Sequence, residues 1–427
     1  MHTVTLPNHD EDDWPSDWHK SIDSDAVKAN ARRVIIHSAP YDLWEGRDWD
    51  VWSNWEGRGH YPAFTDSISR IKELRDLTSV NINFSNECMG VESTRNADEK
   101  ESSRARVNTL KAVFRAIQER AEENPGFPRV SSLTIENLQN APIPEFTTSS
   151  LFKTVMKDIR ELHLQVAVEV SWHGPDQDLF QPERVQFEPY LQQHWLAPFA
   201  DQLTALSVSF NECWGTMPGY FDGEGLSFPQ LRSLTLGNFV MSHHHHFNWV
   251  LNQPSLTRLQ LHNCYIASYL HLWDEDLERW KVPLHDCERL PVGSFGFNYS
   301  EDRIYKYPGI WETVFDKIRA SLPNLYEFRF GYDRSFKPHG DYYHKSLENT
   351  RSWLHNARYI ALDTGLQPSP WIDAAEHDGE MQFGESFKEP GGLNVAKEHE
   401  AGDNRAFQEL QQAVSQRKAS SAEKTEG

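Results

Sequence analysis

The expected fold is decided by the segment Pro254–Ile266, which reads PSLTRLQLHNCYI. Within it Leu256, Leu259 and Leu261 follow the spacing apolar-x-x-apolar-x-apolar, with polar residues between them. A period of two over five or six residues is typical of a short β-strand with one buried face. The proline two residues ahead suits a strand entry and ends a preceding helix, because it has no N–H to donate. The segment therefore predicts a short strand that packs its leucines inward.

The same spacing recurs along most of the chain. Nine frames begin at Leu77, Val130, Ile159, Leu203, Leu231, Leu256, Val292, Leu325 and Ala357. Four of them carry a proline two residues ahead, more than 23 prolines in 427 residues would place there by chance. Recurrence at intervals of tens of residues is the signature of a repeat architecture, in which each unit buries its apolar face against its neighbours.

Three of the expected strands also resemble one another residue by residue. Ser132–Leu138 reads SLTIENL, Ser233–Phe239 reads SLTLGNF and Arg258–Cys264 reads RLQLHNC, with asparagine at the same place in each. Extending the frame from Leu256 gives L-x-x-L-x-L-x-x-C-x-I, the consensus of leucine-rich repeats. We therefore predict an α/β fold, an irregular leucine-rich-repeat solenoid over residues 34–375, with a curved parallel sheet on the concave side and helices on the convex side.

Helical patterns fill the intervals between the expected strands. Leu110, Phe114 and Ile117 stand at helical spacing and predict one amphipathic helix. Similar patterns predict helices over residues 151–159, 190–199, 311–322 and 344–353. The two longest intervals contain the polar segments 92–103 and 172–186, which are expected to be inserted loops.

The two ends are expected to lie outside the repeats. Residues 1–33 are polar and acidic and predict a flexible flank. Residues 376–427 are rich in Gly, Glu, Lys, Ser and Ala and predict a disordered tail. Within that tail, Phe407, Leu410 and Val414 predict a turn or two of amphipathic helix, either a terminal helix or a binding peptide.

A group of four tryptophans near the start of the expected solenoid has two interpretations. Trp44, Trp49, Trp52 and Trp55 alternate with acidic residues. Their rings either close the open end of the solenoid, which would otherwise expose apolar core, or form a partner-binding patch.

Composition narrows the functional classes. The chain has 42 Lys+Arg against 63 Asp+Glu, a formal charge of −21. This excess of acid argues against nucleic acid, whose binding needs a dense cationic footprint, and against an anionic membrane surface. No apolar run approaches the roughly 20 residues of a membrane span, and no signal peptide is recognisable. Four cysteines without paired spacing favour a reduced chain inside the cell, in the cytoplasm or nucleus.

The sequence contains no common enzyme motif. There is no G-x-S-x-G, phosphate loop, G-x-G-x-x-G or H-E-x-x-H. The run His243–His246 is interpreted as an exposed loop leading into a helix at Phe247–Leu251, because no carboxylate or cysteine stands at ligand spacing. We therefore expect no catalytic residue, no cofactor and no metal site. An enzyme whose site forms only in three dimensions remains an alternative.

The concave face is the expected partner-binding surface. Residues between the buried frame positions project from it, and leucine-rich repeats commonly bind there. The alternative is an ordinary solvated sheet face. The face is small and neutral in the middle, acidic toward one end and basic toward the other. Its expected contact residues are Glu136, Glu161, His163, Gln165, Ser207, Ser209, Thr235, Arg258, Gln260, His262, Asn298, Arg329 and Asp363.

These motifs resemble a known family. Phe228–Val240 (FPQLRSLTLGNFV), Pro254–Ile266 and Arg33–Trp55 are similar to leucine-rich-repeat regions of fungal F-box-like proteins, and the similarity covers most of residues 33–365. The resemblance implies capture of a protein substrate, coupled through an F-box to the Skp adaptor and a cullin–RING ubiquitin ligase. No F-box is recognisable, since Leu6-Pro7 is followed by NHDED without apolar periodicity. An interaction scaffold unconnected with ubiquitin is the alternative.

Overall fold

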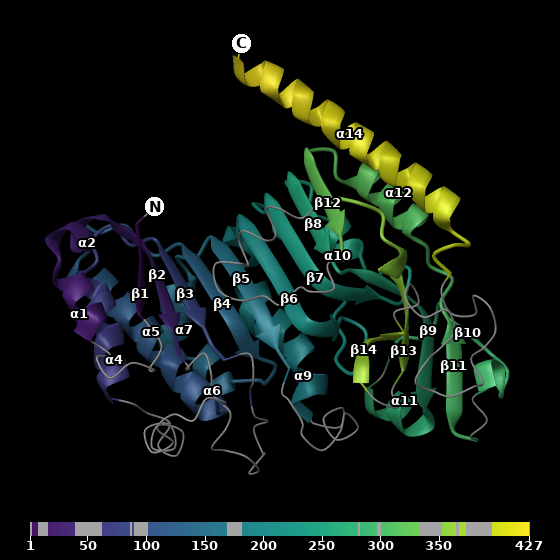
Figure 1. Cartoon of the computed structure of the whole chain (residues 1–427), viewed down its shortest axis with the longest axis horizontal. Coiled ribbons are helices and arrows are strands. Elements are labelled where there is room, and N and C mark those ends of the chain that lie inside the picture. The colour runs from purple at the N-terminus through teal and green to yellow at the C-terminus, as the bar shows by residue number, and fades with distance from the viewer. Residues whose placement is uncertain are drawn as a thin grey trace. The chain divides into compact units, whose positions relative to one another are not determined.

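A computed structural model of the 427-residue chain describes residues 2–6, 16–38, 62–85, 88, 101–168, 182–280, 282–296, 300–332, 352–363, 367–372 and 395–426. It has an α/β fold whose strands pair mostly in parallel (Figure 1), and this confirms the predicted class. The chain divides into two compact units. Unit 1 comprises Met1–Trp172 and Gln202–Leu206, and unit 2 comprises His173–Asp201 and Ser207–Gly427.

In the described part of unit 1, five strands follow chain order and each pairs in parallel with the next. The strands are β1 His2–Leu6, β2 Ala31–His37, β3 Ser79–Asn83, β4 Ser132–Gln139 and β5 Glu161–Ala167. The helices are α1 Ser16–Asp23, α2 Asp25–Asn30, α4 Pro62–Ser69, the 3-10 turn η1 Arg70–Glu73, α5 Ser103–Glu123, α6 Pro144–Thr147 and α7 Ser150–Met156.

The core of unit 1 is built from the apolar positions of these strands and from aromatic rings. One fully buried row crosses four paired strands and consists of Val34, Val80, Leu133 and Leu162. The ring of Phe114 on α5 lies 4.9 Å from that of Phe146 and 5.7 Å from that of Phe152, between centroids. Each such buried side chain contributes about 1.5–3 kcal/mol to folding.

Unit 2 is the more irregular of the two. Its strands are most of β6 Ala205–Trp214, whose first two residues belong to unit 1, and β7 Ser233–Met241, β8 Arg258–His262, β9 Tyr265–Trp273, β10 Glu288–Arg289, β11 Asp302–Lys306, β12 Glu327–Gly331, β13 Tyr359–Asp363 and β14 Gln367–Ile372. Its helices are α9 Pro182–Tyr190, the π-helix η2 Leu191–Leu196, α10 Asn248–Leu251, α11 Asp274–Trp280, α12 Trp311–Ser321 and α14 Glu400–Glu426. Short 3-10 turns are η3 Ala197–Gln202, η4 Ser294–Gly296 and η5 Asn356–Arg358.

Strand β7 has two neighbours on one side, so the sheet of unit 2 divides after it. The residues from Ser233 to Gly237 pair with β8, whereas Val240 and Met241 pair with β9. Strand β8 then pairs in parallel with β12. Strand β9 pairs in parallel with β13 and antiparallel with β11. This division was not predicted, because β9 begins only three residues after β8 ends and none of the nine predicted frames was placed on it.

The predicted frames locate the parallel strands well. Eight of the nine begin two residues before a strand, namely β3, β4, β5, β6, β7, β8, β12 and β13. The frame at Val292 is wrong, because this residue is 66% exposed in a turn and the nearby β11 runs antiparallel to β9. The apolar spacing there arose without a strand.

The shared asparagine marks a common left-handed turn of the backbone, which lies inside β4 and β7 and directly after β8. Asn137, Asn238 and Asn263 all have positive φ, at 58°, 58° and 48°. Asparagine tolerates this left-handed backbone better than most residues. The Nδ2 group of Asn137 donates to the carbonyl of Phe84 at 2.8 Å, and that of Asn238 donates to the carbonyl of Phe210 at 2.6 Å. The amide thus satisfies backbone that the turn leaves without a strand partner.

The predicted helices are mostly present. Those expected around Leu110, over 151–159, over 190–199 and over 311–322 correspond to α5, α7, the region from α9 to η3, and α12. Most of the helix expected over 344–353 lies outside the described residues, and residues 352 and 353 are not helical. The segment Pro182–Gln186, expected to be a loop, belongs to α9. Among the helices of the described ranges, none combines the length and apolar character of a bilayer span.

The expectation of a flexible flank over residues 1–33 is wrong for the described residues 2–6 and 16–33. Strand β1 pairs in parallel with β2, and helices α1 and α2 lie between these two strands in the chain. Trp18 is 1% exposed, and its indole Nε1 donates to the carbonyl of Ser67 on α4 at 2.9 Å. Leu6 and Ile22 are fully buried. This part of the flank folds because Leu6, Trp18 and Ile22 are buried almost completely, which the surrounding acidic residues concealed in the sequence.

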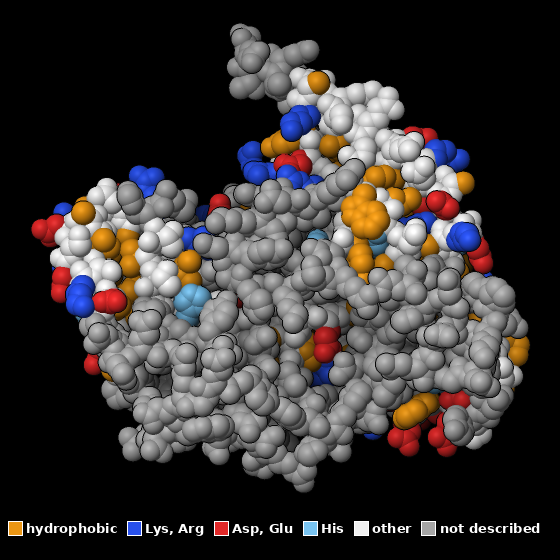
Figure 2. All heavy atoms as spheres, in the orientation of Figure 1, with side chains coloured by type: hydrophobic (Ala, Val, Ile, Leu, Met, Phe, Trp, Pro, Cys, Tyr) orange, Lys and Arg blue, Asp and Glu red, His pale blue; other side chains and the backbone are white. Residues whose placement is uncertain are grey.

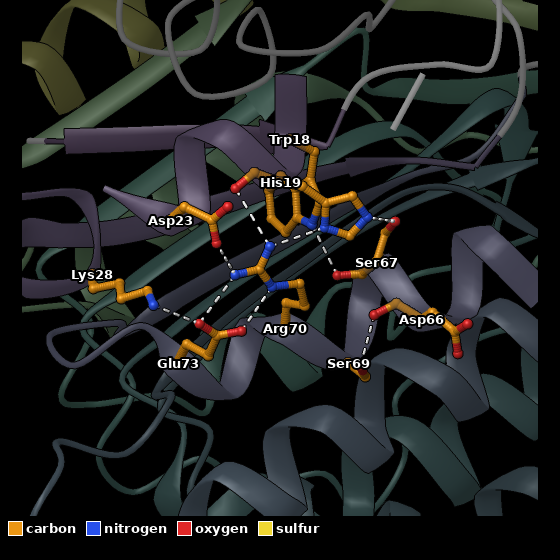
Figure 3. Close-up of polar contacts among 9 residues, drawn as sticks. All are labelled: Trp18, His19, Asp23, Lys28, Asp66, Ser67, Ser69, Arg70 and Glu73. Atoms are coloured by element: carbon orange, nitrogen blue, oxygen red, sulfur yellow. Dashed lines mark hydrogen bonds and ion pairs between the residues drawn. The ribbon is translucent and has the colours of Figure 1, made fainter. Parts of the chain in front are cut away.

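Arg70 joins these N-terminal helices to the rest of unit 1 (Figure 3). Its guanidinium contacts Asp23 at 2.6 Å, Glu73 at 2.7 Å and His19 Nδ1 at 3.0 Å. Lys28 of α2 reaches the same Glu73 at 2.8 Å. The hydrogen bond from Arg70 lowers the pKa of Glu73 to about 2, against the opposing effect of partial burial, and Lys28 adds to the lowering.

The expectation of a disordered tail over residues 376–427 is wrong for α14. The three predicted apolar residues of this helix, Phe407, Leu410 and Val414, are buried. Phe407 lies against Phe315 of α12, with the ring centroids 5.4 Å apart. Of the two predicted alternatives, a terminal helix and a binding peptide, α14 is therefore the terminal helix, docked on the rest of unit 2. Residues 376–394 lie outside the described residues.

Candidate functional site

The predicted contact residues of unit 1 lie on one face of β4 and β5, where the register aligns them in rows. Ser132 stands opposite Glu161, and Thr134 stands opposite His163. Glu161 is exposed and His163 is half-buried, whereas Glu136 is fully buried and Gln165 is 2% exposed. Only the first two therefore remain accessible to a partner.

Glu136 and Gln165 have structural partners. Asn81 of β3 donates through Nδ2 to Glu136 Oε1 at 2.9 Å. The side-chain oxygen of Gln165 accepts the backbone N–H of Asn137 at 3.3 Å, at the asparagine turn described above. Buried polar groups of this kind need such bonds, because leaving them unpaired costs on the order of 1–3 kcal/mol each. These bonds hold both side chains within the sheet.

The predicted contact residues of unit 2 lie on β6, β7, β8 and β12. Across β7, β8 and β12 the register aligns Thr235 with Gln260 and Arg329. Four of the predicted residues are buried, with 8% of the surface or less exposed: Ser207, Ser209, Thr235 and His262. Gly237 explains part of this burial, because a Cβ at this position would come within 2.6 Å of the Cβ of Ser209.

The accessible part of this surface is small, and we call it the β8–β12 face. It consists of Arg258, Gln260, Glu327 and Arg329, which occupy alternate positions of two paired strands. Arg258 is exposed and the other three are half-buried. Arg329 forms an ion pair of 2.8 Å with Glu327, which stands opposite Arg258. Figure 2 shows basic and acidic side chains gathered together in the region of β8 and β12, beside α14. The face therefore presents mixed charge on a rigid backbone.

Two predicted contact residues cannot be placed on this face. Asn298 lies outside the described residues, as do the four tryptophans at positions 44–55. Asp363 belongs to β13, whose register sets it opposite His271 of β9, in the other branch of the unit 2 sheet. The frame spacing did not reveal that the branches separate.

The histidine run differs from its prediction. It leads into helix α10 as expected, but His243 and His246 are buried, and only His244 and His245 are exposed. His246 is structural, since its Nδ1 accepts the backbone N–H of Ser242 at 3.1 Å and its Nε2 lies 2.8 Å from the carbonyl of Phe221. The fold also brings Asp286 to the run, where it accepts the backbone N–H of His244 at 2.8 Å.

Sequence spacing gave no signal for that carboxylate, because Asp286 is 42 residues from His244. His243, His285 and Asp286 each offer one ligand atom, and these atoms lie within 4.8 Å of one another. These three residues are the ones that could hold a metal ion within the described ranges. The absence of a carboxylate at ligand spacing was the reason to expect no metal site, and that reason does not hold in three dimensions.

A buried acid lies in the same unit. Burial raises the pKa of Glu188 on α9 to about 8, although a hydrogen bond and the charge of Arg184 oppose the rise. The hydrogen bond comes from the backbone N–H of Gly215 at 2.9 Å. Gly219 also lies against this carboxyl group, with room for no Cβ. Glu188 thus holds the chain that follows β6.

Compared with family models, curated proteins and solved structures, the chain shows no match to any of them.

Proposed function

We propose that this chain is a leucine-rich-repeat solenoid inside the cell that binds another protein through the β8–β12 face. The recurrent frames, the parallel strands and the asparagine turns support the repeat assignment. The observation that carries the binding proposal is the accessibility of Arg258, Gln260 and Arg329 on a face whose other predicted residues are buried. Arginine is favoured at such surfaces because its planar guanidinium binds carboxylates with two hydrogen bonds.

The narrower proposal is a substrate receptor of a cullin–RING ubiquitin ligase, as the resemblance to fungal F-box-like proteins implies. A scaffold without any link to ubiquitin is the other form of the same binding function. Both use the β8–β12 face, and they differ only in whether the Skp adaptor also binds. The formal charge of −21 favours a protein partner over nucleic acid in either form.

A photo-reactive amino acid in place of Gln260 tests the binding surface. In cells, we expect it to cross-link the full-length chain to a discrete protein. The matched control carries the same probe at Glu278, an exposed residue of α11 in the same unit. Arg258→Glu should weaken the binding of the captured protein by about tenfold or more, the loss of one good interface contact. Equal capture from both positions, or unchanged affinity of the Arg258→Glu chain, would reject the β8–β12 face.

Titration of the purified chain with purified Skp adaptor separates the two forms. Binding in the micromolar range or tighter supports the ligase receptor. If no heat of binding is measured at physiological salt while the cross-link at Gln260 persists, the scaffold is the correct form.

A further inference from the structure

His243 is placed as a metal ligand would be. It follows β7 in a turn, is 6% exposed, and its Nε2 lies 2.7 Å from the hydroxyl of Tyr220. Its other ring nitrogen, Nδ1, is buried without a hydrogen-bond partner among the described residues. A buried ring nitrogen without a partner is costly, so this arrangement calls for a ligand at Nδ1. Burial also lowers the pKa of His243 to about 4, which keeps the ring neutral near pH 7.

Two further donors come from the segment between α11 and β10. His285 Nε2 lies 3.5 Å from Asp286 Oδ2, and both residues fall within the 4.8 Å cluster with His243. Bonds of about 2.0–2.2 Å to a tetrahedral ion separate its ligand atoms by roughly 3.3–3.6 Å. The distance of 3.5 Å between His285 Nε2 and Asp286 Oδ2 already falls within this range. The side chain of His285 is 59% exposed, and its ring centroid lies 5.5 Å from that of His243.

We propose that His243, His285 and Asp286 bind one divalent transition-metal ion, with Zn²⁺ the best match. Two imidazoles and one carboxylate are a donor set that zinc takes in proteins, with water in the remaining position. Two nitrogen donors argue against Mg²⁺ and Ca²⁺, because these ions favour sites made of oxygen donors. Bound metal would join the turn after β7 to the segment before β10.

Groups around the three donors hold them in position. The hydroxyl of Tyr220 contacts Nε2 of His243 at 2.7 Å, so Nδ1 is the ring nitrogen left for a metal, and the tautomer that binds it carries its proton on Nε2. The backbone N–H of His244 fixes one oxygen of Asp286 at 2.8 Å. Burial acts to raise the pKa of Asp286, but this bond and the neighbouring histidines outweigh it and the pKa is lowered. The carboxylate is therefore ionised and oriented before metal arrives.

The rest of the histidine run does not contribute. Both nitrogens of His246 are occupied, as described above. His245 Nδ1 lies 3.1 Å from the amide of Asn248, and His244 Nδ1 lies 3.4 Å from the hydroxyl of Tyr307. The site is thus distinct from the loose metal affinity of any exposed oligohistidine, and the chain offers a matched control in His245.

The test is titration of the chelator-treated full chain with Zn²⁺, and with Co²⁺ to read the ligand field from visible absorption. We expect one equivalent to bind. His285→Ala and Asp286→Asn should each weaken binding by at least about tenfold, and Tyr220→Phe by about 10–100-fold as an outer-sphere change. His245→Ala should bind as the unaltered chain does. Circular dichroism of each variant without metal verifies that it is folded.

Two results would overturn the site. One is wild-type affinity in the His285→Ala and Asp286→Asn chains. The other is an equal loss in His245→Ala, which would mean that the exposed run alone binds the ion. The cross-link at Gln260 should persist in His285→Ala, so failure of the metal site and failure of the partner-binding face are told apart.

Discussion

At the scale of single residues, Glu188 makes the stability of unit 2 depend on pH. Its pKa is raised by burial from 4.5 to about 8 in the folded chain. The folded state therefore keeps a proton that the unfolded state releases above about pH 4.5, and the free energy of unfolding falls as the pH rises from there to about 8. Glu188→Gln keeps an acceptor for the Gly215 N–H but removes the titration. Relative to the unaltered chain, it should gain stability by up to about 1.4 kcal/mol per pH unit over this window.

Urea unfolding at pH 5 and pH 8 measures this difference. The exposed Glu275→Gln on α11 is the control, and its stability relative to the unaltered chain should be the same at both values. A Glu188→Gln chain whose relative stability does not change between the two pH values would show that this carboxyl is ionised in the fold.

At the scale of elements, one buried carboxylate adds to the apolar docking of α14. Asp403 is fully buried and accepts from Arg358 Nε at 2.7 Å, the Tyr359 hydroxyl at 2.8 Å and the backbone N–H of Glu312 at 2.8 Å. Arg358 is itself 1% exposed. Removing one member of a buried ion pair costs about 3–5 kcal/mol, because the other charge stays buried. Asp403→Ala should lower the free energy of unfolding by that amount in urea titrations.

The matched control for this element is Glu400→Gln, which changes an exposed carboxylate in the first turn of the same helix. It should stay within about 0.5 kcal/mol of the unaltered chain. An Asp403→Ala chain as stable as this control would mean that α14 is not held on unit 2 by the Asp403 contacts.

At the scale of the whole molecule, the division into two compact units predicts separate responses to core damage. Trp18 in unit 1 and Trp311 in unit 2 are equivalent probes, since both are buried and both donate their indole N–H to a backbone carbonyl at 2.9 Å. Truncation of a buried tryptophan to alanine costs about 3–5 kcal/mol. By hydrogen exchange, Trp18→Ala should reduce protection in β2 and β3 and spare β8 and β12, and Trp311→Ala should do the reverse.

Loss of protection in all four strands for either variant would instead show that the chain unfolds as one cooperative unit. The two variants serve as controls for each other, because the residue type and its hydrogen bond are the same.

Local spacing made the strands and most helices predictable. The frame from Leu256 reflects the alternating burial of a strand, and the asparagines at 137, 238 and 263 reflect a positive φ; both are local properties of the backbone that leave a pattern in the sequence. The folded N-terminal flank was missed because its period is short and lies among acidic residues. The antiparallel β11 was missed because its pairing with β9 follows no frame.

By itself the sequence determined the α/β class, the entries of eight strands and the apolar face of α14. Only the tertiary structure decided which polar residues stay accessible. Glu136 and Arg258 both alternate with the buried frame positions of their strands, yet one is buried and the other exposed. It also decided that Asp286 meets the histidine run. Burial and convergence depend on residues far apart in the chain, and their distances in space leave no period in the sequence.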